Sequence, residues 1–422
     1  MSFLKRADIE TIRSEYRSFC ERYRVYLSGT EPRRSAELDI RLSFTVALVE
    51  MIFSLSSSHC VRSLDREASL SGSAIGCFVQ DVLYRDLFAK ENCKIIDQLK
   101  MADSKSAWSS NMVSLLGRVD MNSPGGLVTA FSEIYAVLLS FRLTGDFFVQ
   151  NGIGEGCMLE SSSIDLERST FGKKRSGSFY TPVYLADELV GRAIQELEAG
   201  AFEWQGKKIL DPACGPGVFL VSAFNKLSGR VDLNSPLELL YGVDLDPVCV
   251  FLTRVVLNHL DPEYGAQKIS DQIVQADSLR CFREKSATIP LDFPREGEFD
   301  VVLGNPPWEI AKLDSRQFFV LYDRDFYSYG KQRALEAQRF IFERNPEVEL
   351  EWQRLNRQFK EDVGFYKKHY EYRGRGDANL YKYFVEAGLS LLKDGGVLSY
   401  LVPAGIYCDR GAAPLRKHLL EQ

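Results

Sequence analysis

The stretch KKILDPACGPGVFLVSAFNKL, residues 207–227, decides the fold of the second half of the chain. A short apolar run leads into two closely spaced glycines, and a helix-type pattern of apolar residues follows them. This order is typical of a parallel strand that turns through a tight loop into a helix. The stretch therefore predicts the first strand–helix unit of an α/β domain.

The same alternation continues toward the end of the chain. Further strand-type runs follow, with helical segments between most of them: ELLYGVDLD, QIVQADSL, FDVVLGNPP and GGVLSYLVPAG. Alternation of this kind predicts right-handed strand–helix–strand units and a mainly parallel sheet with helices on both faces. Ligands of such sheets lie at the carboxyl ends of the strands. The unusual residues of this half all fall at such ends.

The first part of the chain has a different pattern. Up to about residue 145, apolar residues recur at three- and four-residue steps, for example Val46, Val49, Ile52 and Phe53. That spacing predicts an all-helical domain. Residues 145–178 are irregular and rich in Gly and Ser, which is typical of a domain junction. We therefore divide the chain into a helical domain with linker, residues 1–165, and an α/β domain, residues 166–422.

Composition places the chain among soluble globular proteins, since 45% of its 422 residues are hydrophobic and 26% are charged. Its most apolar stretches are interrupted by charged residues and fall short of the roughly 20 apolar residues of a membrane span. We expect a cytoplasmic protein without a membrane partner. The nine cysteines form no CxxC pair and the four histidines have no ligand spacing, so neither a disulfide framework nor a metal site is predicted.

The net charge of −6 argues against a uniformly basic nucleic-acid binder. Residues 354–376 nevertheless form a local basic segment, which includes Lys367, Lys368, Arg373 and Arg375. Five aromatic residues are interleaved with the charges: Phe359, Phe365, Tyr366, Tyr370 and Tyr372. A groove that follows phosphates and stacks bases needs this combination. A solvated helix face followed by a loop would produce the same pattern.

Acidic residues and glycines mark the first three strand ends. Asp211 and the glycines Gly215 and Gly217 follow the first strand, where a ligand can approach the backbone closely. Asp244 ends the second strand, where a carboxylate can accept both ribose hydroxyls. Asp277 follows the third, where a carboxylate can accept an adenine amine. No Lys-Ser/Thr pair follows the glycines, as a phosphate-binding loop would require, so we expect a nucleoside ligand without phosphates.

Asp246, two residues after Asp244, has a simpler interpretation. It precedes Pro247, and an Asp followed by Pro is typical of a helix N-cap with proline at the first helical position. We therefore expect Asp246 to begin the next helix.

The stretch FDVVLGNPPWE, residues 299–309, carries the chemistry of the fourth strand end. Two prolines fix the backbone and remove two N–H donors, which leaves the Asn305 side-chain oxygen and the Pro306 carbonyl as a rigid pair of acceptors. Such a pair suits a planar NH2 group, and Trp308 can stack on the ring that carries it. A cytosine-C5 enzyme would instead need a cysteine nucleophile in such a loop, and none is present there.

In this order, the motifs resemble those of the S-adenosylmethionine-dependent, amino-methylating DNA methyltransferases, specifically the N6-adenine branch of restriction-modification and phage-defence systems. The resemblance covers roughly residue 169 to the end of the sequence and includes GSFYTP (177–182), DPACGPGVF, GVDLD, ADSL, NPPW and GDANLYKYF. It implies a Rossmann-like methyltransferase fold, S-adenosylmethionine as cofactor and duplex DNA as substrate. It also implies a flipped target adenine.

The resemblance also implies the roles of individual residues. The catalytic residues are Asn305, Pro306, Pro307 and Trp308. The cofactor-binding residues are Tyr180, Thr181, Pro182, Asp211, Ala213, Gly215, Gly217, Phe219, Asp244, Leu245, Asp277 and Ser278. We assign DNA contacts to Lys367, Lys368, Arg373 and Arg375, within an inserted segment at 309–376 that is longer than a simple strand–helix connection needs.

Two questions stay open at this stage. The family sheet has seven strands and a separate target-recognition domain, whereas this sequence ends one helix after the fifth strand, so we expect a truncated or split enzyme. Its partner would be the missing C-terminal part, or a specificity, nuclease or other defence-complex subunit. Alternative functions are N4-cytosine methylation, methylation of RNA or of a protein glutamine, and a non-catalytic recognition subunit.

Overall fold

The structure of the protein is a computed structural model of residues 1–422. It describes residues 5–23, 45, 110–120, 123–139, 141–144, 165–168, 181–199, 203–230, 233–284, 289–310, 313–320, 322–372 and 379–421. None of the helices within these ranges is long and apolar enough to cross a membrane.

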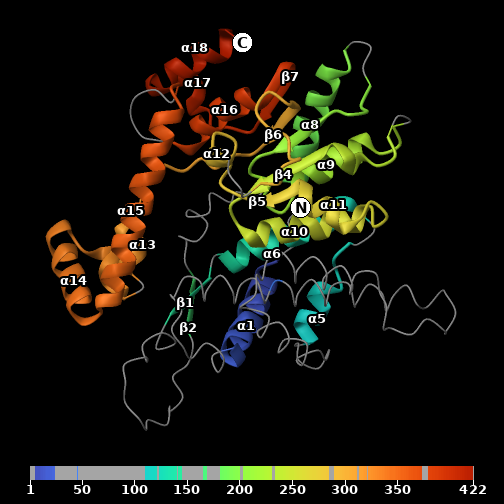
Figure 1. Ribbon diagram of the computed structural model, residues 1–422. Coiled ribbons are helices and arrows are strands. Elements are labelled where there is room, and N and C mark those ends of the chain that lie inside the picture. Colours follow the sequence, from blue (N-terminus) through green and yellow to red (C-terminus); the bar gives the residue numbers. More distant parts are fainter. Residues whose placement is uncertain are drawn as a thin grey trace.

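A five-stranded parallel sheet forms the centre of the described chain (Figure 1). Its order is β5-β4-β3-β6-β7, and every neighbouring pair is parallel. The strands are β3 (Ile209–Asp211), β4 (Leu240–Asp244), β5 (Ile273–Gln275), β6 (Phe299–Gly304) and β7 (Leu392–Tyr400). The chain runs outward from β3 to β5 and then returns to the other side of β3 with β6. The strand order therefore reverses between β3 and β6, which is where such sheets bind ligands.

Helices cover both faces of the sheet, as the alternating pattern predicts. One face packs against α8 (Val183–Leu197), α9 (Val218–Leu227) and α10 (Pro247–Leu260). The other packs against α12 (Ser278–Cys281) and α16 (Leu380–Leu391). Neighbouring strand residues point to opposite faces of the sheet. Ile209 packs on the side of α8, α9 and α10, and Leu210 packs on the side of α12 and α16. The predicted Rossmann-like three-layer fold is confirmed.

Smaller elements connect these layers. The 3-10 helix η4 (Pro236–Leu239) leads into β4, and α11 (Ala266–Gln272) leads into β5. After β7 the chain forms α17 (Gly405–Cys408), η6 (Arg410–Ala412) and α18 (Ala413–Glu421).

The described N-terminal elements are partly helical and partly extended. The helices are α1 (Arg6–Tyr23), α5 (Ser110–Leu116) and α6 (Pro124–Leu139), while Val46, Val49, Ile52 and Phe53 lie outside the described residues. A correction concerns β1 (Phe141–Thr144) and β2 (Asp165–Arg168), which form an antiparallel pair where we expected only helix and irregular chain. Each of these strands has only four residues, which is too few to show the alternation of a strand in the sequence. The strand with which each one pairs also lies outside its local sequence.

The helix α6 joins the N-terminal part to the sheet. Its side chains share one continuous core with α1, α9, α10 and the strands. Tyr135 on α6 is fully buried, and its hydroxyl donates a hydrogen bond to the Asp246 carboxylate at the start of α10. The division at residue 165 stays a prediction, but α6 packs directly on α9 and α10, and α1 packs on α6.

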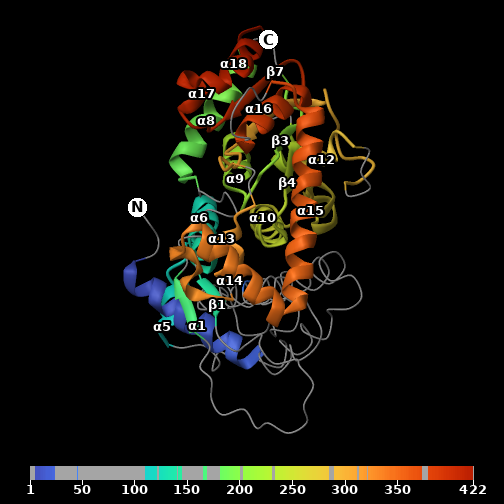
Figure 2. The ribbon, with the colours of Figure 1, turned by 90° about the vertical axis from the view of Figure 1, so that its left-hand side faces the viewer.

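The segment between β6 and α16 forms a helical arm, which we define as residues 313–370. It contains α13 (Ser315–Phe319), the 3-10 helix η5 (Arg324–Ser328), α14 (Lys331–Arg344) and α15 (Pro346–His369). Phe318, Phe319 and Phe326 form a small core of their own with Ile341 and Val348. Figures 1 and 2 show α15 running from the region of α12 and α16 out to α13 and α14, away from the sheet.

The Tyr135–Asp246 bond predicts a measurable contribution to stability. Tyr135→Phe removes only the hydroxyl and leaves Asp246 without this buried donor, so we expect the free energy of unfolding to fall by about 1–3 kcal/mol. Urea unfolding measures it. Tyr407→Phe is the control, because Tyr407 is 79% exposed and its change should stay within about 0.5 kcal/mol. Equal stability of both variants would contradict the assigned role.

Candidate active site

The carboxyl ends of β3 and β6 lie side by side because these two strands pair. Asp211 is the last residue of β3, and only 1% of it is exposed. Gly304 is the last residue of β6 and has a φ of 142°. A Cβ atom on Gly304 would lie 2.5 Å from Asp211 Oδ1, so only glycine allows the two strand ends this approach. The residues after each strand, including Asn305, are thereby brought together.

Asn305 also contacts the segment before α8. Its side-chain Nδ2 donates to Thr181 Oγ1 over 3.1 Å, and Thr181 is buried. Pro182 is exposed and directly precedes α8. The structure thus brings the predicted cofactor residue Thr181 to the predicted catalytic asparagine, across 124 positions of sequence. Tyr180 lies outside the described residues.

The rest of the NPPW loop is held in place by its surroundings. Pro306 is buried, whereas Pro307 and Trp308 are half-buried. The Trp308 indole Nε1 donates to the Leu401 carbonyl over 3.2 Å, and its ring packs in a cluster that includes Tyr381 and Ile406. Two prolines and this hydrogen bond fix both the backbone and the plane of the indole ring.

The glycine loop after β3 is shaped around Asp244. The Gly215 N–H donates to Asp244 Oδ2 over 2.8 Å, and the Asp246 N–H donates to Asp244 Oδ1 over 2.8 Å. Gly215 has a φ of 52°, and a Cβ atom there would meet nothing within 4 Å. Gly217 is the residue before α9. The loop therefore leaves open space at Gly215, and two backbone donors orient the Asp244 carboxylate.

The sequence analysis did not identify one residue that supports this loop. The Thr253 hydroxyl on α10 donates to the Gly215 carbonyl over 2.7 Å and holds the turn from behind. No local pattern marks Thr253, which is buried inside a helix of apolar residues. Asp246 has the simpler role that we expected, because it caps α10 by accepting a hydrogen bond from the Val248 N–H over 2.9 Å.

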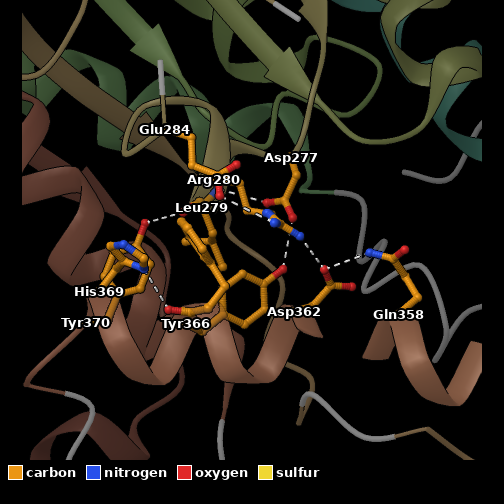
Figure 3. Close-up of polar contacts among 10 residues, drawn as sticks. Asp277, Leu279, Arg280, Glu284, Gln358, Asp362, Tyr366, His369 and Tyr370 are labelled. Atoms are coloured by element: carbon orange, nitrogen blue, oxygen red, sulfur yellow. Dashed lines mark hydrogen bonds and ion pairs between the residues drawn. The ribbon is translucent and has the colours of Figure 1, made fainter. Parts of the chain in front are cut away.

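The third strand end carries Asp277 and Ser278. Asp277 caps α12, accepting the Leu279 N–H over 2.9 Å with Oδ1. Its Oδ2 accepts the Tyr366 hydroxyl over 2.9 Å, as Figure 3 shows. Ser278 is buried, and its hydroxyl donates to the Pro212 carbonyl, which ties this strand end to the glycine loop.

The other predicted cofactor residues differ in placement. Ala213 lies in the loop, and its N–H donates to Asp211 Oδ1 over 3.0 Å. Leu245 is 70% exposed next to Asp244. Phe219, on α9, is 3% exposed and belongs to the hydrophobic core. Phe219 therefore packs in the core, and its contact with the cofactor stays a prediction.

Burial controls the protonation of the acids at these strand ends. Burial raises the pKa of Asp211 from 3.8 to about 8, against the opposing hydrogen bond from Ala213. Burial likewise raises the pKa of Asp244 to about 6. The pKa of Asp277 is also raised by burial, and the hydrogen bond from Tyr366 opposes the shift. Each of these carboxylates would therefore be stabilised by a donor-rich or cationic ligand.

The site fits S-adenosylmethionine in its donor and acceptor groups. Asp211 Oδ2 is a buried oxygen without a hydrogen-bond partner among the described residues, which suits the positively charged amino group of the cofactor. Asp244 suits the ribose hydroxyls, and the open space over Gly215 suits close contact between backbone and ligand.

The predicted DNA-binding residues fall in and after the arm. Lys367 and Lys368 are exposed on α15, while Arg373 and Arg375 lie outside the described residues. The expectation for the interleaved aromatic residues needs correction. Tyr366 and Tyr370 are buried against α12 and α16, and Tyr372 stacks on His418 with ring centroids 3.8 Å apart. Tyr366 and Tyr370 thus serve internal packing at the end of α15, and Tyr372 is stacked just beyond it, so these three rings are not free to stack with bases.

Two family models match the chain. Residues 167–334 match the model described as N-6 DNA Methylase. This part of the chain is therefore similar to the DNA N6-methylases. Residues 352–422 match the model described as Eco57I restriction-modification methylase. The resemblance that we inferred from the motifs is therefore confirmed, and a methylase of this family implies S-adenosylmethionine as the methyl donor.

Curated relatives support the same family. The chain is 29% identical over 154 residues to the methylase subunit of the type I restriction enzyme MjaIX of Methanocaldococcus jannaschii, covering 34% of this chain and 21% of that protein. It is 27% identical over 150 residues to the type II methyltransferase M.BanIII of Aneurinibacillus aneurinilyticus, covering 34% and 24%. The match thus spans only about a fifth to a quarter of these relatives.

Solved structures resemble the chain more distantly. A DrdV–DNA complex matches with 13% identity and a TM-score of 0.48, covering 98% of this chain and 34% of that chain. The methyltransferase subunit of a type I restriction-modification system from Streptococcus thermophilus matches with 16% identity and a TM-score of 0.39, covering 97% and 79%. The fold assignment rests on the strand order.

The close approach at Gly304 predicts a sensitive position. Gly304→Ala places a methyl group against Asp211 and requires a backbone conformation that L-residues rarely adopt, so we expect a loss of about 1–3 kcal/mol in unfolding free energy. Gly364→Ala on α15 is the control, because a Cβ atom there meets nothing within 4 Å and alanine favours helix. Chemical denaturation of both variants checks this. An unchanged unfolding free energy in Gly304→Ala would show that the close approach of Gly304 to Asp211 does not require glycine.

The buried Asp211 predicts a pH dependence of stability. Because its pKa is about 8 in the folded chain and 3.8 ordinarily, the native state favours the protonated form. The stabilisation of the native state by protonated Asp211 is fully present below about pH 4, and it is lost as the pH rises through about 8. Relative to Asp211→Asn, the wild type should therefore lose up to about 1.4 kcal/mol of unfolding free energy per pH unit in this window. Parallel pH profiles in denaturant unfolding would contradict the assignment.

Proposed function

We propose that the chain is a site-specific methyltransferase that moves a methyl group from S-adenosylmethionine to the exocyclic N6 of an adenine in duplex DNA, within a restriction-modification or phage-defence system. The observation that carries this proposal is the position of Asn305 at the strand-order reversal, directly after Gly304, which closely approaches Asp211, and hydrogen-bonded to Thr181. The family of residues 167–334 supports the same activity.

The cofactor residues have distinct tasks in this proposal. Asp244 accepts the ribose hydroxyls, Asp277 accepts the adenine amine of the cofactor, and Asp211 faces its amino group. When bound, S-adenosylmethionine supplies an electrophilic methyl group on a positively charged sulfur. Thr181, held against Asn305, keeps the cofactor segment before α8 and the catalytic loop in contact. Proximity and orientation then supply most of the rate acceleration.

The NPPW loop positions the target amine. The Asn305 side-chain oxygen and the Pro306 carbonyl accept hydrogen bonds from the two hydrogens of the amine. The nitrogen lone pair is thereby drawn out of conjugation with the ring and directed toward the methyl group. Trp308, fixed by its bond to Leu401, stacks on the face of a base flipped out of the duplex. These residues hold and orient the amine, and no protein nucleophile takes part.

The decisive experiment is mass spectrometry of nucleosides from unmethylated genomic duplex DNA after incubation with the chain and methyl-labelled S-adenosylmethionine. We expect labelled N6-methyladenine. Asn305→Ala should lower the rate by at least about 100-fold while cofactor affinity stays within about threefold. Label in N4-methylcytosine, RNA or protein would replace the proposed substrate. Cofactor binding without any labelled product would favour a non-catalytic recognition subunit.

We also propose that exposed basic residues of α15 contact the DNA backbone, with Arg373 and Arg375 in the segment that follows. Lys367→Gln together with Lys368→Gln should weaken binding to all duplexes alike and reduce the slope of log affinity against log salt by about 2. Lys268→Gln on α11, at the other side of the molecule in Figure 1, is the control. Fluorescence anisotropy over a salt series measures both. An unchanged slope in the double variant would exclude this surface.

A further inference from the structure

The helix α15 contacts α12 and the Asp277 cap of α12 through a regular set of polar side chains (Figure 3). Asp362, Tyr366 and Tyr370 follow one another at four-residue steps, so they share one face of the helix. All three reach the short helix α12 and its capping residue: Asp362 binds Arg280 over 2.8 Å, Tyr366 binds Asp277 over 2.9 Å, and Tyr370 binds the Leu279 carbonyl over 2.7 Å. Together these three polar contacts fix where α15 lies relative to α12 and Asp277.

The middle contact of this set reaches the carboxylate of Asp277 itself. Tyr366 is 9% exposed, and burial together with the neighbouring carboxylate raises the pKa of its phenol above the usual range, so it remains a donor. Asp277 Oδ1 accepts the Leu279 N–H, while Oδ2 accepts the Tyr366 hydroxyl. Two donors on different oxygens fix the rotation of the carboxylate, and each oxygen keeps a second lone pair for a ligand.

The flanking contacts hold α15 in place around Tyr366. The Arg280 guanidinium lies between Asp362 and the Phe365 ring, 4.8 Å from the ring centroid. Tyr366 and Tyr370 also share a buried cluster with Leu279 and Tyr383, against which Ala213 of the glycine loop packs. The arm thus contacts two of the loops that form the proposed cofactor site.

We propose that Tyr366 is a positioning residue of the cofactor site, through which the inserted arm holds Asp277 in the orientation that reads the adenine amine of the cofactor. This inference rests on the proposed function, because it requires an adenosyl ligand at Asp277. It assigns to the arm a role in cofactor recognition in addition to DNA contact. Lys367 and Lys368 directly follow Tyr366, so the two roles meet within one helical turn.

A binding measurement on the full chain without DNA tests this role. Isothermal titration gives the dissociation constants of S-adenosylhomocysteine and of S-inosylhomocysteine, in which a carbonyl oxygen replaces the adenine amine. The ratio of the two constants reports how well the site reads the amine. We expect the wild type to prefer the adenosyl compound by at least about tenfold. Tyr366→Phe should reduce this ratio by about tenfold, mainly through weaker binding of the adenosyl compound.

Two further variants separate positioning from packing. Tyr329→Phe removes a hydroxyl bound to Asp323 elsewhere in the arm, and the ratio should remain within about twofold of the wild type. Asp362→Asn breaks the ion pair with Arg280 but leaves Tyr366 intact, so it should give a smaller fall of about threefold. This second variant keeps the test decisive if Tyr366→Phe does not fold.

The outcomes distinguish this inference from the proposed function. A wild type that binds neither compound would overturn the proposed function and this inference with it. A wild type that binds both equally would show that Asp277 does not read the amine, which also overturns the inference. A discriminating wild type whose ratio is unchanged by Tyr366→Phe and Asp362→Asn would leave the proposed function standing and reduce Tyr366 to a packing residue.

Discussion

The parallel pairing of β3 with β6 is the constraint on which the site depends. It brings the carboxyl ends of strands about ninety residues apart in sequence to one edge of the sheet, where only the missing side chain of Gly304 lets Asp211 fit. The cofactor loop and the NPPW loop begin directly after these two residues. Their relative position is therefore a property of the sheet, which is the most rigid part of the fold.

Around this edge, the ends of β3, β4 and β5 each contribute one acidic side chain in a buried setting. Burial raises the pKa values of Asp211, Asp244 and Asp277. The charged forms of these groups are therefore unfavourable to the folding free energy of the chain at neutral pH. A ligand with a cationic amino group, ribose hydroxyls and an adenine amine offsets that cost group by group. The same acids that disfavour the ligand-free state thus favour a ligand of this chemistry, as buried functional groups often do.

The sequence predicts the fold and the local parts of the site well. The strands, the glycine loop and the Asp246 cap follow from short-range patterns, because period, turn residues and capping residues act within a few positions. Local sequence patterns do not predict contacts between segments that are distant in the chain. The bonds from Tyr135 to Asp246 and from Tyr366 to Asp277 span 111 and 89 positions, and no local pattern reveals either partner. The aromatic spacing of α15 was visible, but a buried and a base-stacking helix face look alike in sequence.

Whether the cofactor loop and the NPPW loop form one catalytic centre is best tested by a crystal structure of the chain with S-adenosylhomocysteine bound. We expect the ribose at Asp244, the adenine at Asp277 and the sulfur facing Asn305 across the ends of β3 and β6. A ligand bound elsewhere, or one whose sulfur points away from Asn305, would contradict the claim that the cofactor loop and the NPPW loop form one catalytic centre.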